Sequence, residues 1–208
     1  MWILRAILDL LFPQSRNASR VTDASPEALG FLVRPEHIGN DIVALIPYRT
    51  PLARACIVEA KFKDNERAHD LLAGVLADYL NEWSADETPF TPGALVLVPV
   101  PLSKMRLKER GYNQVERIAR KAAAKLPDVY LDTDLLIRTR DTLPQTTLSG
   151  RARRQNLKGA FASSTSPDSE HTYIVFDDVV TTGATLSNAL QALRDAGASR
   201  VLGLALAH

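Results

Sequence analysis

From Ala94 onward the sequence alternates short apolar runs with helical periodicities, and this alternation constrains the fold more than any other feature. The run ALVLV is wholly apolar, as expected of a strand that is covered on both faces. Strands that alternate with helices predict an α/β fold in which helices flank a parallel sheet. The expected strands are residues 94–98, a stretch within 131–139, 172–176 and 200–207, and the expected helices are 113–126 and 186–196.

The residues before Ala94 carry weaker patterns. Residues 13–41 are rich in Pro, Ser, Asn, Asp and Gly without a sustained apolar period, which predicts a loop or poorly ordered connector. A short β-branched run, a helical stretch that reaches about Phe62 and a longer helix with one apolar face follow. We therefore expect an N-terminal helix and connector in 1–41, a small hood region in 42–93 and the core domain in 94–208.

The cysteine content and the first residues indicate the compartment. A single cysteine, Cys56, excludes an internal disulfide and a thiolate zinc site. Arg5 and Asp9 interrupt the apolar start of the chain, and no small-residue cleavage site follows, so we expect no export signal. No run approaches the roughly 20 apolar residues that a membrane span requires. These features predict a cytoplasmic protein without a membrane span.

The net charge of +1 conceals a strong asymmetry. Residues 101–158 hold 14 Lys and Arg against 6 Asp and Glu, whereas the rest of the chain holds 11 against 18. The basic half therefore suits an anionic partner, which is either a phosphorylated ligand or, weakly, a single-stranded nucleic acid. A solvated basic surface without such a partner explains the same counts.

The segment IVFDDVVTTGAT, residues 174–185, joins an apolar strand to a helix through two carboxylates, a glycine and three hydroxyls. Open α/β sheets bind ligands at the carboxyl ends of their strands. Gly183 permits a tight turn there, and the N–H groups of the following helix suit a phosphate monoester. Asp177 and Asp178 would repel that phosphate, so they should meet sugar hydroxyls or a metal ion beside it. A ribose 5-phosphate donor combines these groups. The competing interpretation is structural, with a strand end followed by a threonine cap.

The string VFDDVVTTGAT resembles the phosphoribosyl diphosphate (PRPP) signature of type I phosphoribosyltransferases. The resemblance implies that Asp177 and Asp178 are catalytic and contact the ribose hydroxyls. It also implies that the 5′-phosphate is bound by Thr181, Thr182, Gly183, Ala184 and Thr185.

Beyond this motif the chain resembles the competence protein ComF family over about residues 42–208. The matching segments are Tyr48 through Lys61-Phe62, Pro99-Val100-Pro101-Leu102, Arg110-Gly-Tyr-Asn-Gln114, and Gln145, Leu148, Arg153, Asn156 and Phe161. Members commonly carry an N-terminal four-cysteine zinc finger, which this sequence lacks because Cys56 is its only thiol.

The resemblance implies a type I phosphoribosyltransferase-like core with a small N-terminal hood and Mg²⁺ bound together with PRPP. No residue pattern assigns the metal ligands. The implied diphosphate-binding residues are Val100, Pro101, Lys104 and Arg110. The basic stretch 138–158 has no clear apolar period, which is typical of a lid over an anionic donor or of a solvated loop. Its candidate ligand-contacting residues are Arg140, Gln145, Arg153 and Asn156.

Three functions follow from these features. The first is a glycosyltransferase that moves ribose 5-phosphate from PRPP to an unidentified nitrogen acceptor and releases diphosphate. The second is a module related to competence and DNA uptake that senses PRPP or binds single-stranded nucleic acid without turnover. The third is a scaffold whose ligand site is vestigial.

Tyr112 in the RGYNQ segment is expected to pack rather than to stack on a base.

Overall fold

The computed structural model describes residues 16–87, 93–140 and 159–208, and the statements below concern these residues. Their main feature is a six-stranded sheet in the order β1-β2-β8-β7-β3-β4. Five of these strands pair in parallel, and only the edge strand β1 runs antiparallel. The structure thus confirms an α/β fold with a mostly parallel central sheet. The strands are β1 (Glu36–His37), β2 (Ile42–Ile46), β3 (Leu95–Pro99), β4 (Val129–Leu131), β7 (Thr172–Val179) and β8 (Arg200–Ala207).

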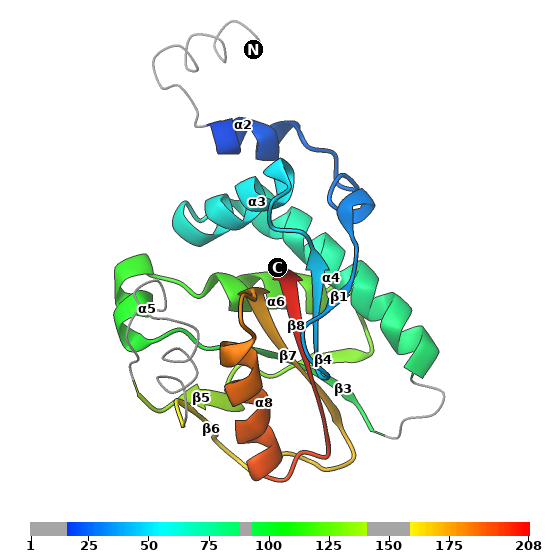
Figure 1. Ribbon diagram of the computed structural model, residues 1–208, viewed down its shortest axis with the longest axis vertical. Coiled ribbons are helices and arrows are strands. Elements are labelled where there is room, and N and C mark those ends of the chain that lie inside the picture. Colours follow the sequence, from blue (N-terminus) through cyan, green and yellow to red (C-terminus); the bar gives the residue numbers. More distant parts are fainter. Residues whose placement is uncertain (1–15, 88–92, 141–158) are drawn as a thin grey trace, which may run out of the picture.

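Helices cover both faces of this sheet (Figure 1). The α4 and α6 helices pack on one face, whereas α8 packs on the other. The central strand β7 supplies Ile174 and Phe176 to the first face and Tyr173 and Val175 to the second, because side chains alternate along a strand. The helices are α2 (Arg16–Asp23), the 3₁₀ helix η1 (Gly30–Leu32), α3 (Pro51–Phe62), α4 (Glu66–Glu87), α5 (Lys104–Arg110), α6 (Gln114–Ala123) and α8 (Ala184–Asp195).

The connections around β3 and β7 determine where a ligand can bind. From β3 the chain passes through α5 and α6 to β4, and from β7 it passes through α8 to β8 on the opposite side. Adjacent parallel strands whose connections leave in opposite directions open a crevice beyond their carboxyl ends. The predicted carboxylates and the Pro99-Val100-Pro101 segment lie at these two strand ends.

Several expectations about the elements need correction. The stretch expected to be a connector contains α2, η1 and β1. Val21 and Leu29 are fully buried there, but they lie eight residues apart, so the sequence shows no apolar period. Helix α5 was also not expected, because none of its residues is buried and it has no apolar face. Helix α6 ends at Ala123 rather than near Leu126.

A small second sheet lies against α8. It consists of β5 (Leu136–Arg138) and β6 (Phe161–Ser163), which pair antiparallel so that Arg138 faces Phe161. Most of the expected lid lies between these strands and outside the described residues. Within the described part of the chain, no helix has both the length and the apolar content that crossing a membrane requires.

Candidate functional site

The two predicted carboxylates lie in the last residues of β7, which continues to Val179. Asp178 is buried, whereas Asp177 is partly exposed, because successive side chains of a strand point to opposite faces. The backbone N–H of Asp178 donates a hydrogen bond to Asp177 Oδ1 at 2.9 Å. We call these two residues the acid pair.

The loop after the acid pair has the shape that the sequence predicts. Gly183 has a φ of 73°, in the left-handed region, and α8 begins at the next residue. A Cβ atom at Gly183 would lie 3.3 Å from Ile42 Cδ1, so the backbone is also closely packed. Thr181 and Thr182 are exposed, Ala184 is buried and Thr185 is partly exposed. These residues line a small pocket together with Asp177, at the amino end of α8. A helix amino end favours anions.

The segment after β3 lies beside the last part of β7, the strand that leads into this loop. The backbone N–H of Val100 donates to the carbonyl oxygen of Phe176 at 2.8 Å, which continues the pairing of β3 with β7. Asn113, the N-cap of α6, donates from Nδ2 to the Val100 carbonyl oxygen at 3.1 Å. Val100 is buried and Pro101 is partly exposed. The two segments implied to bind the 5′-phosphate and the diphosphate of PRPP therefore follow the carboxyl ends of two adjacent strands.

Two side chains from other elements hold Asp178. Gln114 donates from Nε2 to Asp178 Oδ2 at 2.7 Å, and Gln114 is itself only 2% exposed. Lys61, in the last turn of α3, places its Nζ 3.5 Å from the same oxygen. Arg110 donates a short hydrogen bond to Gln114 Oε1. Asp178 is thus at the centre of a network that joins α3, the α5–α6 loop and β7.

Three cations act on the two carboxylates of the acid pair. Burial and the adjacent Asp178 charge raise the pKa of Asp177 to about 7, while the positive charges of Lys61 and Arg106 act against that rise. Burial also lowers the pKa of Arg110, and the Asp178 carboxylate opposes this change. A strongly perturbed carboxyl group in a crevice is typical of a functional site.

The fit of this site to Mg²⁺ follows from the same charges. Mg²⁺ prefers oxygen ligands and keeps several waters. The positive charges of Lys61, Arg106 and Arg110 already act on the acid pair, so a divalent cation bound directly to it would be repelled by three positive charges. The diphosphate oxygens of a donor and water are better ligands than the acid pair in this setting. We assign no side chain of the chain to the metal.

The structure brings some predicted residues together and leaves others apart. The acid pair, the 181–185 loop, Val100 and Arg110 belong to one network or lie beside it. Lys104 is an exposed residue of α5, and among the described residues no hydrogen bond or ion pair joins it to the acid pair. Arg140 is exposed at the end of a described range. Gln145, Arg153 and Asn156 lie outside the described residues.

Sequence reasoning missed Lys61 and Gln114 as site residues, although both belong to segments that carry the family resemblance. A signal for Gln114 was present, because Gln114, Ile118 and Ala122 recur every four residues on the buried face of α6. A glutamine on an otherwise apolar face needs a polar partner. No comparable signal marks Lys61, which is one of several lysines near the end of a helix.

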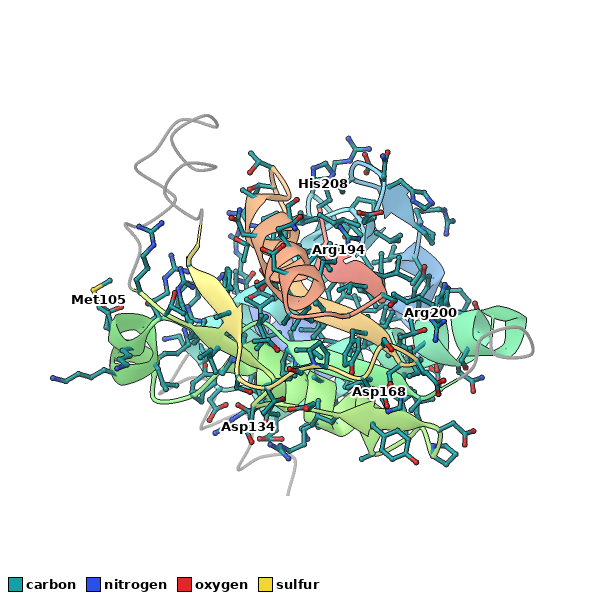
Figure 2. The ribbon with its side chains drawn as sticks, turned by 90° about the horizontal axis from the view of Figure 1, so that it is seen from below. Met105, Asp134, Asp168, Arg194, Arg200 and His208 are labelled. Atoms are coloured by element: carbon teal, nitrogen blue, oxygen red, sulfur yellow. The ribbon has the colours of Figure 1, made fainter. Side chains whose placement is uncertain are left out.

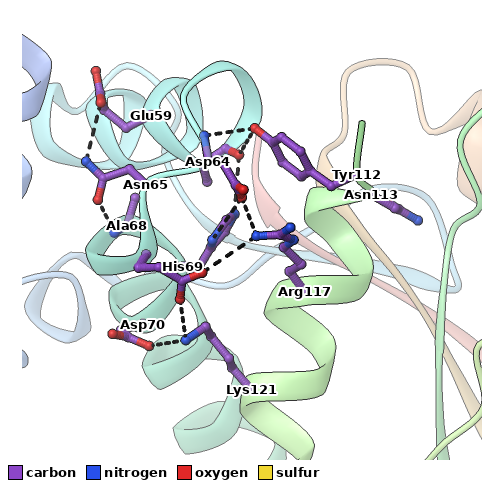
Figure 3. Close-up of polar contacts among 12 residues, drawn as sticks. Glu59, Asp64, Asn65, Ala68, His69, Asp70, Tyr112, Asn113, Arg117 and Lys121 are labelled. Atoms are coloured by element: carbon purple, nitrogen blue, oxygen red, sulfur yellow. Dashed lines mark hydrogen bonds and ion pairs between the residues drawn. The ribbon is translucent and has the colours of Figure 1, made fainter. Parts of the chain in front are cut away.

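A second polar cluster lies at the corner between α3 and α4 (Figure 3). Ligand atoms of Asp64, Glu66 and His69 lie within 4.8 Å of one another. Arg117 Nη1 lies 2.6 Å from Asp64 Oδ1, and Lys121 Nζ lies 2.8 Å from Glu66 Oε2. Cations of α6 already pair with both carboxylates, so we interpret this cluster as a junction between the hood and the core rather than as a metal site.

Comparison with known proteins gives the family. No family model matches the chain. Competence protein F of Haemophilus influenzae is 33% identical over 183 residues, which make up 86% of this chain and 78% of that protein. DNA utilization protein YhgH of Escherichia coli K12 is 39% identical over 105 residues, 50% of this chain and 45% of that protein. The protein of the same name from Salmonella typhimurium is also 39% identical over 105 residues. The similarity to competence protein F covers most of both chains, and the chain therefore belongs to the ComF family.

Proposed function

We propose that this chain is a PRPP-binding protein with a type I phosphoribosyltransferase fold, and that it transfers ribose 5-phosphate to a nitrogen acceptor. One observation carries the proposal: the acid pair, the 181–185 loop and the Pro99-Val100-Pro101 segment all lie at the carboxyl ends of the adjacent strands β3 and β7, where the sheet connections diverge. PRPP has a phosphate, a ribose and a diphosphate in that order. The three parts of the site offer each of these groups a chemically suitable partner.

Each part has a role that follows from its chemistry. Backbone N–H groups at the start of α8 and the Thr181 and Thr182 hydroxyls would bind the 5′-phosphate. The acid pair would accept hydrogen bonds from the two ribose hydroxyls and stabilise positive charge on the ribose ring. Arg106 and Arg110 would attract the diphosphate. Mg²⁺ bound to the diphosphate would neutralise charge on the leaving group.

The proposed reaction is a substitution at C1 of the ribose. The bond from C1 to the diphosphate oxygen breaks with its electron pair on the diphosphate, and the acceptor nitrogen forms the new bond to C1. The proton on that nitrogen then leaves to solvent or to a basic group. Because the ribose ring is electron-deficient between these two events, the carboxylates beside it lower the energy of the transition state.

The names of the relatives refer to competence and to DNA utilization. They are compatible with a second candidate, a non-catalytic module related to competence and DNA uptake that senses PRPP or binds single-stranded nucleic acid. Helix α5 supplies a specific observation for it. Lys104 and Lys108 are exposed there beside Met105 and Leu107, which are 45% and 46% exposed. Figure 2 shows Met105 at the outer side of α5, away from the sheet. Positive charge beside exposed apolar groups suits an unpaired nucleic acid strand.

Calorimetric titration with PRPP and Mg²⁺, followed by measurement of diphosphate release, tests the proposal. We expect saturable binding, and diphosphate release when the correct nucleobase or small amine is added. Binding of PRPP without release for any acceptor would favour the sensing module. No binding of PRPP, together with salt-dependent binding of an oligonucleotide, would favour the nucleic acid module.

The double variant Asp177→Asn, Asp178→Asn provides a direct test of the acid pair. It removes two charges with little change in volume, so we expect a folded protein whose PRPP affinity falls at least about tenfold. Asp134→Asn is a suitable control because Asp134 is exposed in the turn before β5 (Figure 2). Unchanged PRPP affinity in the folded double variant would contradict the assignment of ribose to the acid pair.

A further inference from the structure

Tyr112 forms hydrogen bonds with the corner between α3 and α4 (Figure 3). The Tyr112 hydroxyl donates to the Ala60 carbonyl oxygen at 2.9 Å and accepts from the Asp64 backbone N–H, also at 2.9 Å. Arg117 pairs with the Asp64 carboxylate at 2.6 Å and places its guanidinium 4.8 Å from the centre of the Tyr112 ring. We call these contacts of Tyr112 and Arg117 with Ala60 and Asp64 the Tyr112 latch.

The latch holds a strained backbone. Asp64 has a φ of 50°, and it is the one non-glycine residue with a positive φ in the described part of the chain. Such a conformation persists only where surrounding contacts determine it. Here both the N–H and the carboxylate of Asp64 are bound by residues of the core, Tyr112 and Arg117. The corner of the hood therefore takes its conformation from the core.

Lys61 is the residue next to Ala60, and its side chain reaches the acid pair. Its Nζ lies 3.5 Å from Asp178 Oδ2, and its side chain remains 27% exposed. A long, partly exposed lysine side chain loses conformational entropy when it is confined, so it stays near one carboxylate only if its backbone is held. The hydrogen bond from Tyr112 to Ala60 provides that restraint one residue away.

The first residue of α6 and the loop before it thus act on Asp178 by two routes. Gln114 contacts the carboxylate directly, at 2.7 Å. Tyr112, two residues earlier, reaches the same carboxylate through the backbone of α3 and the side chain of Lys61. Both routes end on Oδ2, so together they hold the carboxylate in one orientation.

We propose that Lys61 is a positioning residue for the acid pair and that the Tyr112 latch holds Lys61 in place. Helix α3 then supplies the charge that orients Asp178 for the ribose hydroxyls. This proposal rests on the proposed function, since it concerns the same site. It adds a residue outside the PRPP motif and a route by which the hood controls that motif.

The test is a double-mutant cycle on PRPP affinity in the presence of Mg²⁺. Lys61→Met removes the charge, and Tyr112→Phe removes only the hydroxyl. We expect Lys61→Met to weaken binding about tenfold and Tyr112→Phe to weaken it about threefold. In the double variant we expect the loss of Lys61→Met alone, because a latch that acts through Lys61 has no further effect once Lys61 is gone. Lys61→Arg should restore most of the affinity.

Controls come from the neighbouring residues. Lys63→Met removes an exposed positive charge two positions along the chain, and Tyr130→Phe removes a hydroxyl from a tyrosine that is 64% exposed. Both should bind PRPP as the unsubstituted protein does. Equal affinities for Lys61→Met and Lys63→Met would overturn the role of Lys61, and additive losses in the double variant would overturn the role of the latch.

A second readout needs no PRPP and so separates this proposal from the proposed function. Titration of the aspartate carboxyl carbons by NMR reports directly on Asp177, which faces the charges of Asp178, Lys61 and Arg106. Removal of the Lys61 charge should raise the pKa of Asp177 further, whereas Lys63→Met should leave it unchanged. If PRPP does not bind at all, the proposed function fails, and an unchanged titration in Lys61→Met then overturns the role of Lys61 as well.

Discussion

The acid pair and the junction between α4 and α6 contain the same kinds of residues in different surroundings. At the junction, Lys121 lies 2.8 Å from both Glu66 and Asp70, and all three side chains are at least one third exposed. A hydrogen bond from Lys121 lowers the pKa of Glu66. At the acid pair, burial and a like charge raise the pKa of Asp177. Exposed carboxylates that each pair with a cation form structural contacts. Two adjacent carboxylates, one of which has a raised pKa, are more typical of a site that binds a ligand.

Among variants near the acid pair, Gly183→Val should have the largest effect on PRPP binding. A valine there needs a φ of 73° and would push its Cβ to 3.3 Å from Ile42 Cδ1, so the 181–185 loop must move. We expect no measurable PRPP binding by calorimetry. Gly39→Val is a matched control, because Gly39 has a φ of 72° and its added Cβ would meet nothing within 4 Å. A normal PRPP isotherm for Gly183→Val would remove this loop from the site.

Gln114→Leu should have the next largest effect. The change leaves Asp178 Oδ2 without its hydrogen bond at 2.7 Å and removes the acceptor for Arg110. We expect PRPP affinity to fall about tenfold and stability to fall by roughly 1–3 kcal/mol, measured by calorimetry and denaturant unfolding. Gln191→Leu removes an exposed glutamine that donates to Asp195 at 2.7 Å, and it should change neither quantity appreciably. Equal behaviour of the two variants would mean that Asp178 needs no partner.

Asp177→Asn should change how stability depends on pH. The pKa of Asp177 is about 7 in the folded protein, against an ordinary value of 3.8 for an aspartate, so between these two pH values the folded state binds one proton more than the unfolded state. That contribution to stability is present below about pH 4 and is lost as the pH rises through about 7. Asparagine does not ionise, so the Asp177→Asn variant does not lose this stability. At pH 8 its melting temperature should therefore be higher than that of the unsubstituted protein. The gain is about 2–4 °C per kcal/mol for a chain of this size.

A difference in melting temperature that stays constant between pH 4 and pH 8 would contradict the raised pKa of Asp177. Glu170→Gln is a suitable control because Glu170 is exposed in the turn before β7. Its melting temperature should follow that of the unsubstituted protein at every pH.

Lys121→Met should have the smallest effect and tests the other side of the comparison. It breaks two exposed ion pairs, to Glu66 and Asp70, and such pairs contribute within about 1 kcal/mol each. We expect a small loss of stability that shrinks further in high salt, and no change in PRPP affinity. A large change in PRPP affinity would show that the junction belongs to the ligand site.

Much of the core could be predicted because its strands are buried on both faces. The apolar runs of β3, β7 and β8 and the apolar face of α8 are visible without any tertiary information. Other elements carry no such pattern. Helix α5 has no buried residue, and β1 consists of two exposed residues that pair with β2. Tertiary contacts rather than local periodicity decide these elements.

The sequence by itself determined the turn after β7 and the family, because a strand, two carboxylates and a glycine turn are contiguous in the chain. Only the tertiary structure decided what surrounds Asp178. Lys61 and Gln114 reach this carboxylate from 117 and 64 positions away in the chain, and nothing in local sequence sets such distances. They meet because β7 lies at the centre of the sheet, with α3 and the α5–α6 loop both packed at its carboxyl end.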